Sequence, residues 1–216
     1  MADYFSTLTS EQRGNIFTLV SEMDKAGITD KDAKVAILAV VSKESNFVPK
    51  SEVSYKNTSN ARIRDIFGSR VPADDVALNA LKANDEAFFN KVYGGRYGNA
   101  ANEGYKYRGR GYNQLTFKGN YSSIKNRIGV DIVSNPDAVN KPDVASKVVI
   151  DYFLREFEKK GLDINNTGGS TEAFNLIFQA NRGWGKTGPD TTGGYDKALS
   201  RLDGFQQFVE DSSKKK

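Results

Sequence analysis

Two glutamates that lie close together in the chain could perform acid–base chemistry. Glu44 follows the apolar run 35–41, and Glu52 comes eight residues later. The chain contains neither histidine nor cysteine, so proton transfer would fall on Asp, Glu, Lys or Tyr. A pair of carboxyl groups can hydrolyse a glycosidic bond, because one protonates the leaving oxygen while the second acts across the bond. Glu44 is a candidate for the acid of such a pair.

The absent residue types exclude several classes of enzyme. Without histidine and cysteine there is no Ser-His-Asp hydrolase, no cysteine protease and no zinc site built from His or Cys. We expect the chemistry to need no metal and no other cofactor. The absence of cysteine also means that no disulfide framework supports the fold.

Much of the net charge lies at the end of the chain. The 31 basic and 27 acidic residues give a net charge of +4, and Lys214–Lys216 supply three of the positive charges. The rest of the chain is nearly neutral, so we expect no nucleic-acid partner. Residues 210–216 are predicted to form a flexible basic tail that could assist contact with an anionic cell envelope.

The stretch 105–121 mixes residue types that a protein core does not need. It holds five aromatic rings, three glycines and four cationic side chains. A groove for a sugar chain uses this mixture, because rings lie against pyranose faces, amides bind hydroxyls and glycines let the backbone approach a ligand. A basic, aromatic surface strand or loop is the alternative interpretation.

Part of this stretch carries a resemblance to a known family. The residues 107–116, Tyr-Arg-Gly-Arg-Gly-Tyr-Asn-Gln-Leu-Thr, followed by Asn120 and Tyr121, resemble the signature of the family 19 glycoside hydrolases. These chitinase-like enzymes include many bacteriophage endolysins. The segments 129–137 and 181–183 also resemble family segments, and Arg201 falls where a downstream family arginine is expected. The resemblance implies a mainly α, lysozyme-like fold with at most a small β element.

The resemblance also implies roles for the two glutamates. The segment Glu44-Ser-Asn-Phe47 resembles the family segment that holds the catalytic acid, although the paired glycines of the family are not intact here. Glu44 would be the general acid, and its place near a helix C-terminus disfavours the charged form. Glu52 would be the general base of an inverting mechanism, with Thr58 or Ser59 holding the attacking water. Glu103 and Asp65 are the other candidates for the base.

Six further residues are predicted to serve the substrate site. Tyr112 and Gln114 are expected to contact the sugar directly, and Arg110 to brace the catalytic carboxylates. The predicted substrate-binding set is Tyr107, Arg110, Tyr112, Gln114, Asn120 and Asn181. The resemblance implies cleavage of β-1,4 bonds between amino sugars, in peptidoglycan or in chitin.

Peptidoglycan is the favoured substrate. The chain lacks the cysteines that plant-type chitinases use, and we expect neither an appended chitin-binding module nor a cleaved signal peptide. We therefore expect a monomeric endolysin that is made in a host cytoplasm and reaches the periplasm and cell wall at lysis. A lytic transglycosylase and a non-catalytic glycan-binding or virion protein on the same fold stay open as alternatives.

The elements that position these residues are predicted to be helices of one lysozyme-like catalytic domain, residues 1–216. A capping box at 9–12 and apolar residues at helical spacing predict a first helix, and the run 35–41 predicts a buried central helix capped at Thr29 or Asp30. That run is too short to cross a membrane. Ser170 is predicted to cap a later helix. Further helices are expected at 62–67, 74–83, 84–93, 120–128, 142–161 and 195–205, with a loop at 182–194 and any small sheet near 47–60 or 105–116.

Overall fold

The computed structural model describes residues 4–183 and 193–213. The chain divides into two compact units, the first made of residues 1–49 and 141–216 and the second of residues 50–140. Each unit is described here by itself. The prediction of one catalytic domain over the whole chain stays a prediction.

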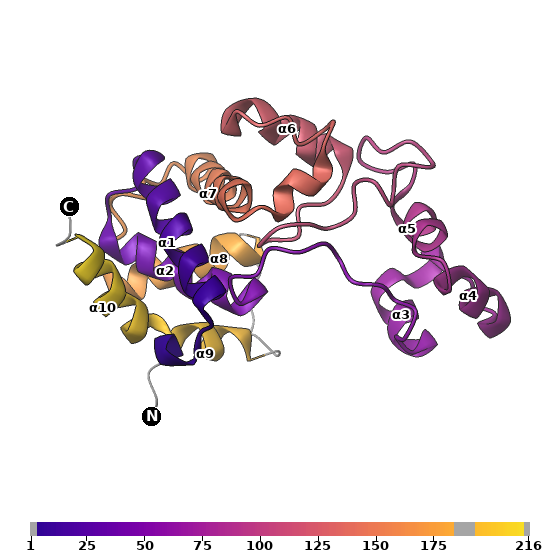
Figure 1. The fold of residues 1–216 in the computed structure, drawn as a ribbon, viewed down its shortest axis with the longest axis horizontal. Helices are drawn as coiled ribbons and strands as arrows, with labels where there is room; N and C mark the ends of the chain where they lie inside the picture. The colour runs from indigo at the N-terminus through magenta and orange to yellow at the C-terminus, as the bar shows by residue number, and fades with distance from the viewer. Residues whose placement is uncertain (1–3, 184–192, 214–216) are drawn as a thin grey trace. The chain divides into compact units, whose positions relative to one another are not determined.

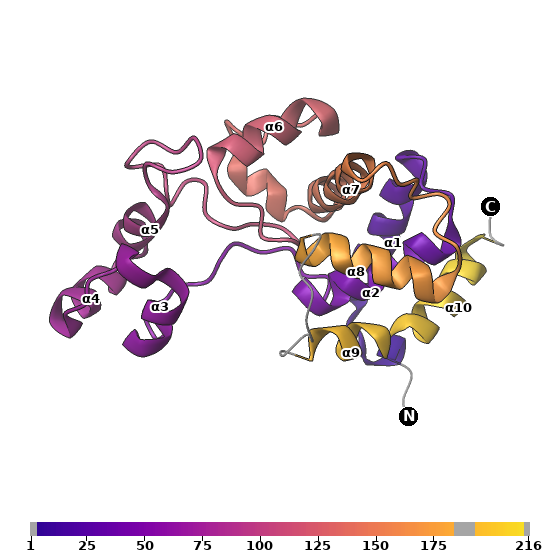
Figure 2. The ribbon, with the colours of Figure 1, turned by 180° about the vertical axis from the view of Figure 1, so that it is seen from behind.

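The first unit is built from helices around α2 (Figure 1). Its elements are η1 (Tyr4–Thr7), α1 (Ser10–Lys25), α2 (Lys31–Ser45), α7 (Pro142–Lys159), α8 (Ser170–Arg182), α9 (Gly194–Leu199) and α10 (Leu202–Ser213). Helix α2 packs against α8, α9 and α10, and α1 packs against α7 (Figure 2). The first unit therefore has α2 at its centre.

Helix α2 is central because its sequence is apolar on every side. The residues from Ala33 to Ser42 are all buried. The Asp30 side chain accepts hydrogen bonds from the N–H groups of Asp32 and Ala33, so it caps the first turn. Asn46 ends the helix in a left-handed conformation. The predicted buried helix is confirmed, with Asp30 rather than Thr29 as its cap.

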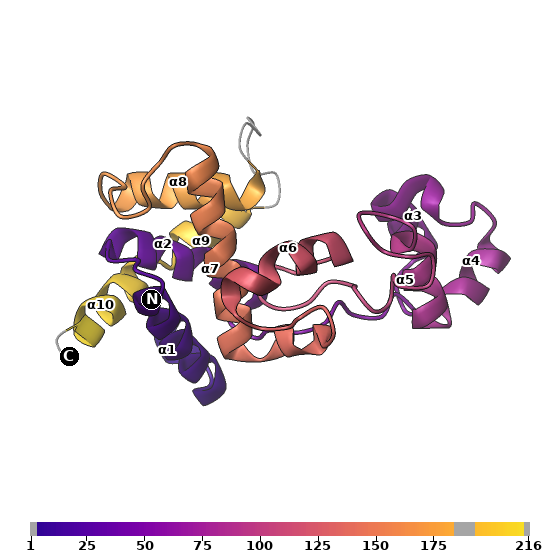
Figure 3. The same ribbon diagram turned by 90° about the horizontal axis from the view of Figure 1, so that it is seen from above.

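Three short helices of the second unit lie close together (Figure 3), and its apolar cluster forms between them. These are α3 (Asn60–Phe67), α4 (Asp75–Lys82) and α5 (Asp85–Tyr93), with the short turn η2 (Gly68–Arg70) after α3. The remaining elements are α6 (Lys118–Ile128) and η3 (Pro136–Asn140). The apolar cluster consists of Ile63, Phe67, Val71, Leu78, Phe88, Phe89 and Val92.

The mainly α fold is confirmed, and its β content is minimal. Within the described ranges no strand forms, and the stretch 105–121 consists of turns and irregular segments that lead into the start of α6. One isolated antiparallel bridge joins Arg110 to Leu115 inside it. No helix in the described part of the chain is long and apolar enough to cross a membrane.

Three local predictions are corrected. Gly169 is the N-cap of α8, so Ser170 is the first helical residue rather than the cap. The expected last helix is broken at Ser200 and Arg201 into α9 and α10. Helix α10 continues to Ser213, so residues 210–213 of the predicted tail are helical, while residues 214–216 lie outside the described part. Most of the predicted loop 182–194 also lies outside it.

Candidate active site

Glu44 lies in the last turn of α2, as predicted, and its side chain remains accessible. Its Oε1 atom accepts a hydrogen bond from Asn181 Nδ2 at 2.8 Å and contacts Lys43 Nζ at 2.9 Å. The side chain of Glu44 is 32% exposed. Helix α8 thus brings Asn181, a residue predicted for the substrate site, directly to the candidate acid.

The turn after Glu44 has an unusual backbone. Asn46 and Phe47 both have positive φ angles, 50° and 58°. A left-handed conformation costs a non-glycine residue roughly 1–2 kcal/mol, which the complete burial of the Phe47 ring offsets by about 1.5–3 kcal/mol. Amide groups of Gln12 and Asn15 bind the carbonyl oxygens of Asn46 and Phe47 at 3.0 and 2.8 Å. The turn is therefore formed without glycine, by burial and by donors from α1.

Arg201 supports the same end of α2. Its Nη1 atom donates to Ser42 Oγ at 2.8 Å, and its guanidinium lies 4.1 Å from the centre of the Tyr4 ring. The Tyr4 hydroxyl in turn donates to Asn46 Oδ1 at 2.8 Å. The arginine expected from the family resemblance thus contacts the helix that carries Glu44.

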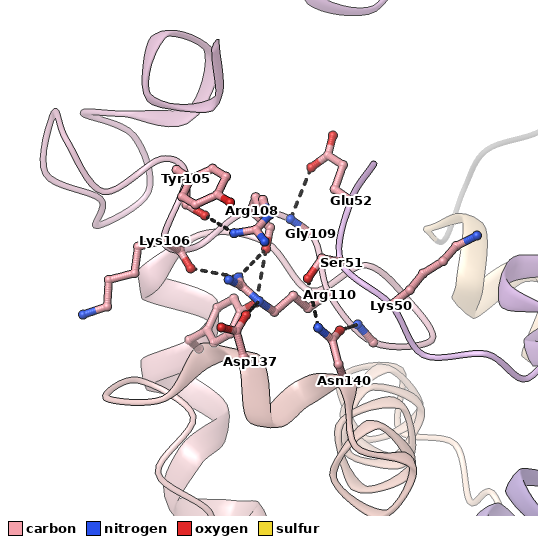
Figure 4. Close-up of polar contacts among 12 residues, drawn as sticks. Lys50, Ser51, Glu52, Tyr105, Lys106, Arg108, Gly109, Arg110, Asp137 and Asn140 are labelled. Atoms are coloured by element: carbon pink, nitrogen blue, oxygen red, sulfur yellow. Dashed lines mark hydrogen bonds and ion pairs between the residues drawn. The ribbon is translucent and has the colours of Figure 1, made fainter. Parts of the chain in front are cut away.

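Glu52, in the second unit, is held far more tightly than Glu44. Its Oε1 atom accepts hydrogen bonds from the hydroxyl groups of Tyr55 at 3.0 Å and Tyr93 at 2.9 Å. Its Oε2 atom accepts from the N–H of Gly109 at 3.2 Å, as Figure 4 shows. The backbone N–H of Glu52 donates back to Gly109 O at 2.7 Å. The carboxylate is therefore oriented by three donors and by its own backbone.

The two tyrosines were not predicted as site residues. Burial raises the pKa of Tyr55 and of Tyr93 well above the ordinary value, and the charge of Glu52 and its hydrogen bonds raise both further. Both hydroxyl groups are therefore protonated and able to donate at neutral pH. Tyr55 could have been suspected because it lies three residues from Glu52, but Tyr93 lies 41 residues away and no local pattern marks it.

Gly109 is the point where the stretch 105–121 meets Glu52. A Cβ atom at this position would lie 2.8 Å from Gln114 Oε1 and 3.3 Å from Glu52 Oε2. The absence of a side chain therefore lets the backbone N–H approach the carboxylate. The sequence predicted glycines where the backbone comes close to a ligand. In the structure, the backbone of Gly109 comes close to the Glu52 carboxylate.

Arg110 makes no contact with Glu52, which corrects the expectation that it braces this carboxylate directly. Its side chain is 3% exposed, and its Nε atom pairs with Asp137 Oδ1 at 2.7 Å. Its Nη1 atom donates to the carbonyl oxygens of Lys106 at 2.8 Å and Arg108 at 3.1 Å (Figure 4). Arg110 thus supports the backbone just before Gly109, and it acts on Glu52 only through that backbone.

The rings of Tyr107 and Tyr112 are buried, each with 1% exposure. The Tyr107 hydroxyl donates to Val133 O at 3.1 Å. Neither ring presents a face to a sugar in this structure, so the prediction of direct ring contact is corrected for both. The sequence predicted that aromatic rings of this stretch line a substrate groove, whereas the rings of Tyr107 and Tyr112 pack in the protein interior.

Gln114 and Asn120 are exposed, as a sugar contact requires. Gln114 Nε2 donates to the carbonyl oxygens of Lys50 at 2.9 Å and Gly111 at 3.2 Å. Asn120 Nδ2 donates to Thr116 O at 2.8 Å. Their roles in substrate binding stay predictions.

The residues predicted to hold water differ in what they already bind. Ser59 caps α3 by accepting from Arg62 N at 3.3 Å, whereas Thr58 is half-buried and its N–H donates to Tyr55 O at 2.9 Å. Thr58 therefore lies in the same short segment as Tyr55, whose hydroxyl donates a hydrogen bond to Glu52. The Ser59 hydroxyl accepts one hydrogen bond as a cap and retains its proton and a second lone pair, so both hydroxyls stay candidates.

The alternative bases are less suitable than Glu52. Glu103 pairs with Lys118 Nζ at 2.8 Å, and the Ala100 N–H together with this lysine holds the pKa of Glu103 below its usual value. Asp65 is exposed on α3. Among residues 4–183 and 193–213, no group of three or more acidic side chains could hold a metal ion.

Comparison with known proteins agrees with the mainly helical fold. Residues 88–174 match the family model Glyco_hydro_19, chitinase class I. A glycosyl hydrolase family 19 domain-containing protein of Haemophilus influenzae is 27% identical over 144 residues, which cover 65% of this chain and 70% of that protein.

The fold is shared with a solved enzyme. Chitinase C from Streptomyces griseus matches with a TM-score of 0.50 and 17% identity, over 91% of this chain and 83% of that chain. The family model, the Haemophilus relative and the shared fold support a chitinase-like glycoside hydrolase of family 19.

Proposed function

We propose that this enzyme is an endolysin that hydrolyses β-1,4 bonds between the amino sugars of peptidoglycan. The observation that carries the proposal is the fixed carboxylate of Glu52, which three donors orient beside the glycine loop of the family signature. A carboxylate held in this way can accept a proton from a water molecule in a defined direction. Glu44, accessible at the end of α2, supplies the second carboxyl group that glycoside hydrolysis needs.

The mechanism uses the two glutamates as acid and base. Glu44 protonates the glycosidic oxygen, and Glu52 removes a proton from a water that attacks the anomeric carbon from the opposite face. The hydroxyl of Thr58 or Ser59 orients this water. Gln114, Asn120 and Asn181 offer amide groups to the sugar hydroxyls, and the amide of Asn181 also orients the Glu44 carboxyl.

Peptidoglycan is preferred over chitin on the basis of composition. The chain has no cysteine for the disulfides of plant-type chitinases. Its terminal lysines, Lys214–Lys216, favour an anionic cell envelope over neutral chitin. We further propose that the protein acts as a monomer, is made in the cytoplasm of a bacterial host and reaches the cell wall at phage-induced lysis.

Loss of turbidity of permeabilised Gram-negative cells tests this proposal. Glu44→Gln should reduce the lysis rate by about 10²–10⁴-fold while binding to isolated cell walls is retained, because the amide keeps the shape of the side chain but cannot donate an acidic proton. Glu158→Gln, an equally conservative change at an exposed position of α7, should lyse like the wild type.

The products and the second glutamate separate the alternatives. Mass spectrometry of the digest should show new reducing ends, which identify the hydrolysed bond. If Glu52→Gln retains activity while Glu44→Gln does not, a lytic transglycosylase replaces the proposed hydrolase. If the wild type binds cell walls without lysing cells, a non-catalytic glycan-binding protein replaces it, and digestion of chitin alone indicates a chitinase.

A further inference from the structure

The hydroxyl groups of Tyr55 and Tyr93 converge on one oxygen of Glu52. They reach Oε1 from different parts of the second unit, Tyr55 from the segment before α3 and Tyr93 from the last residue of α5, at 3.0 and 2.9 Å. We propose that Tyr55 and Tyr93 are positioning residues that occupy Oε1 of Glu52 and leave Oε2 as the atom that takes the proton from water. This inference rests on the proposed role of Glu52 as the base.

The hydrogen-bonding capacity of a carboxylate supports this assignment. Its two oxygens offer about four lone-pair sites. The two tyrosine hydroxyls use the sites on Oε1, and the Gly109 N–H uses one of those on Oε2. The site that remains is on Oε2, next to Gly109, where an added Cβ atom would lie 3.3 Å from this oxygen. Proton transfer would therefore occur beside Gly109.

In the proposed hydrolysis, Oε2 of Glu52 accepts the proton that the attacking water loses. One O–H bond of the water breaks as its proton moves to Oε2, and the water oxygen forms the new bond to the anomeric carbon. The glycosidic bond breaks, and its oxygen leaves with the proton that Glu44 donates. Glu44 ends ionised and Glu52 ends protonated, so proton exchange with solvent restores both groups.

The aromatic core of the second unit fixes both tyrosine rings. The Tyr55 ring stacks on Phe88 at 5.1 Å and meets the edge of Phe67 at 5.1 Å. The Tyr93 ring stacks on Phe89 at 6.0 Å and meets Phe117 at 5.3 Å. Rings packed in this way have few alternative positions, so the two hydroxyls are directed at Glu52 by the core itself.

Tyrosine-to-phenylalanine variants test the inference, because each keeps the ring and removes only the hydroxyl. Tyr93→Phe and Tyr55→Phe should each lower kcat for peptidoglycan by roughly tenfold with KM little changed, as expected when a hydrogen bond to a charged group is lost. The acidic limb of the kcat–pH profile should move to higher pH, because fewer donors then stabilise the carboxylate. The double variant should show the larger displacement.

A tyrosine outside the site provides the control. The Tyr152 hydroxyl donates to a backbone carbonyl, Ala180 O, at 2.7 Å. Tyr152→Phe therefore removes a hydrogen bond of similar length without touching Glu52, and its pH profile should match that of the wild type. A purely structural role for Tyr55 and Tyr93 predicts lower thermal stability with an unmoved pH profile, and that result would overturn the inference.

The Glu52→Gln variant separates this inference from the proposed function. If Glu52→Gln keeps full activity, Glu52 is not the base and the proposed mechanism fails with the inference. If Glu52→Gln is inactive but both phenylalanine variants have wild-type kcat and pH profile, the proposed mechanism stands and the positioning role is excluded. If the inference is correct, adding Tyr93→Phe to Glu52→Gln should cause no further loss of kcat.

Discussion

The two candidate carboxylates are positioned in different ways. Glu44 occupies the end of a helix, and its contacts are the neighbouring Lys43 and one amide, that of Asn181. Glu52 lies outside any helix and is oriented by donors from three places in the second unit, two tyrosine hydroxyls and one backbone N–H. The proposed general acid thus takes its position from secondary structure, whereas the proposed general base takes its position from tertiary structure.

This difference suits the two roles. A general acid must release its proton to the leaving oxygen and regain one from solvent, so an accessible side chain is an advantage. A general base must direct a water at one carbon atom, so a fixed carboxylate is an advantage. The comparison predicts that substitutions around Glu52 affect the protein more strongly than substitutions around Glu44.

The largest effect is expected at Arg110, which supports the backbone beside Glu52. Arg110→Met fills similar space but removes the donor to the Lys106 carbonyl oxygen and one of two donors to the Arg108 carbonyl oxygen, which still accepts from the Tyr121 hydroxyl. Because a partly buried acceptor then loses its partner, the free energy of unfolding should fall by roughly 1–3 kcal/mol. Urea denaturation measures this loss, and kcat of the folded fraction should fall as well because Gly109 is no longer held.

Asp137→Asn separates the ion pair from the carbonyl contacts. Asp137 is 72% exposed, so the pair itself is expected to contribute at most about 1 kcal/mol. This variant should therefore lose much less stability than Arg110→Met. Equal losses in the two variants would show that the ion pair, and not the support of the backbone, is the function of Arg110.

The same contrast explains what could be predicted from the sequence. The capping box, the Asp30 cap and the apolar run predicted α1 and α2, and with them the place of Glu44, because helix signals are local. The partners of Glu52 could not be predicted, since Tyr93 lies 41 residues away and its contact depends on how α5 packs. Sequence reasoning found the carboxylate and missed the groups that orient it.

The aromatic stretch shows a second limit of the same kind. The composition of residues 105–121 predicted a groove for a sugar chain. Composition alone could not distinguish a ring that faces a ligand from a ring that faces the core. Tyr107 and Tyr112 are buried, while Gln114 and Asn120 from the same segment are exposed. A segment without helical or strand periodicity carries no pattern that assigns side chains to an inner or an outer face.

A moderate effect is expected at Asp30, which caps the helix that carries Glu44. Burial raises the pKa of Asp30, but hydrogen bonds from Thr167, Ala33 and Asp32 outweigh it and hold this pKa below the usual value. Loss of the cap in Asp30→Ala should lower the free energy of unfolding by about 1–2 kcal/mol at neutral pH. Thermal denaturation measured at several pH values tests this.

The direction of the pH dependence follows from the lowered pKa. A carboxyl group whose folded-state pKa is depressed stabilises the fold above its unfolded-state pKa, and this contribution disappears as the pH falls through the folded-state value. The difference between Asp30→Ala and the wild type should therefore shrink below about pH 4. Asp32→Ala, the neighbouring control, should cost at most about 1 kcal/mol, and a pH-independent difference at Asp30 would contradict the cap.

The smallest effect is expected at Lys43, although its ammonium group lies only 2.9 Å from Glu44. Both side chains are partly exposed, at 25% and 32%, and exposed ion pairs contribute little because solvent screens them. Lys43→Met should therefore change kcat by less than about threefold, and the change should diminish further as salt is added. Lys31→Met, an exposed position at the start of α2, provides the control for the loss of one charge.

Comparing Lys43→Met with Tyr93→Phe tests whether burial or formal charge decides the importance of a contact. Lys43→Met removes a full positive charge next to one carboxylate, whereas Tyr93→Phe removes a neutral hydroxyl from the other at a nearly identical distance of 2.9 Å. A hydrogen bond in a desolvated, rigid setting is worth more than an ion pair in water, so the neutral change should have the larger effect on kcat. A larger effect of Lys43→Met would mean that the charge beside Glu44 controls the reaction.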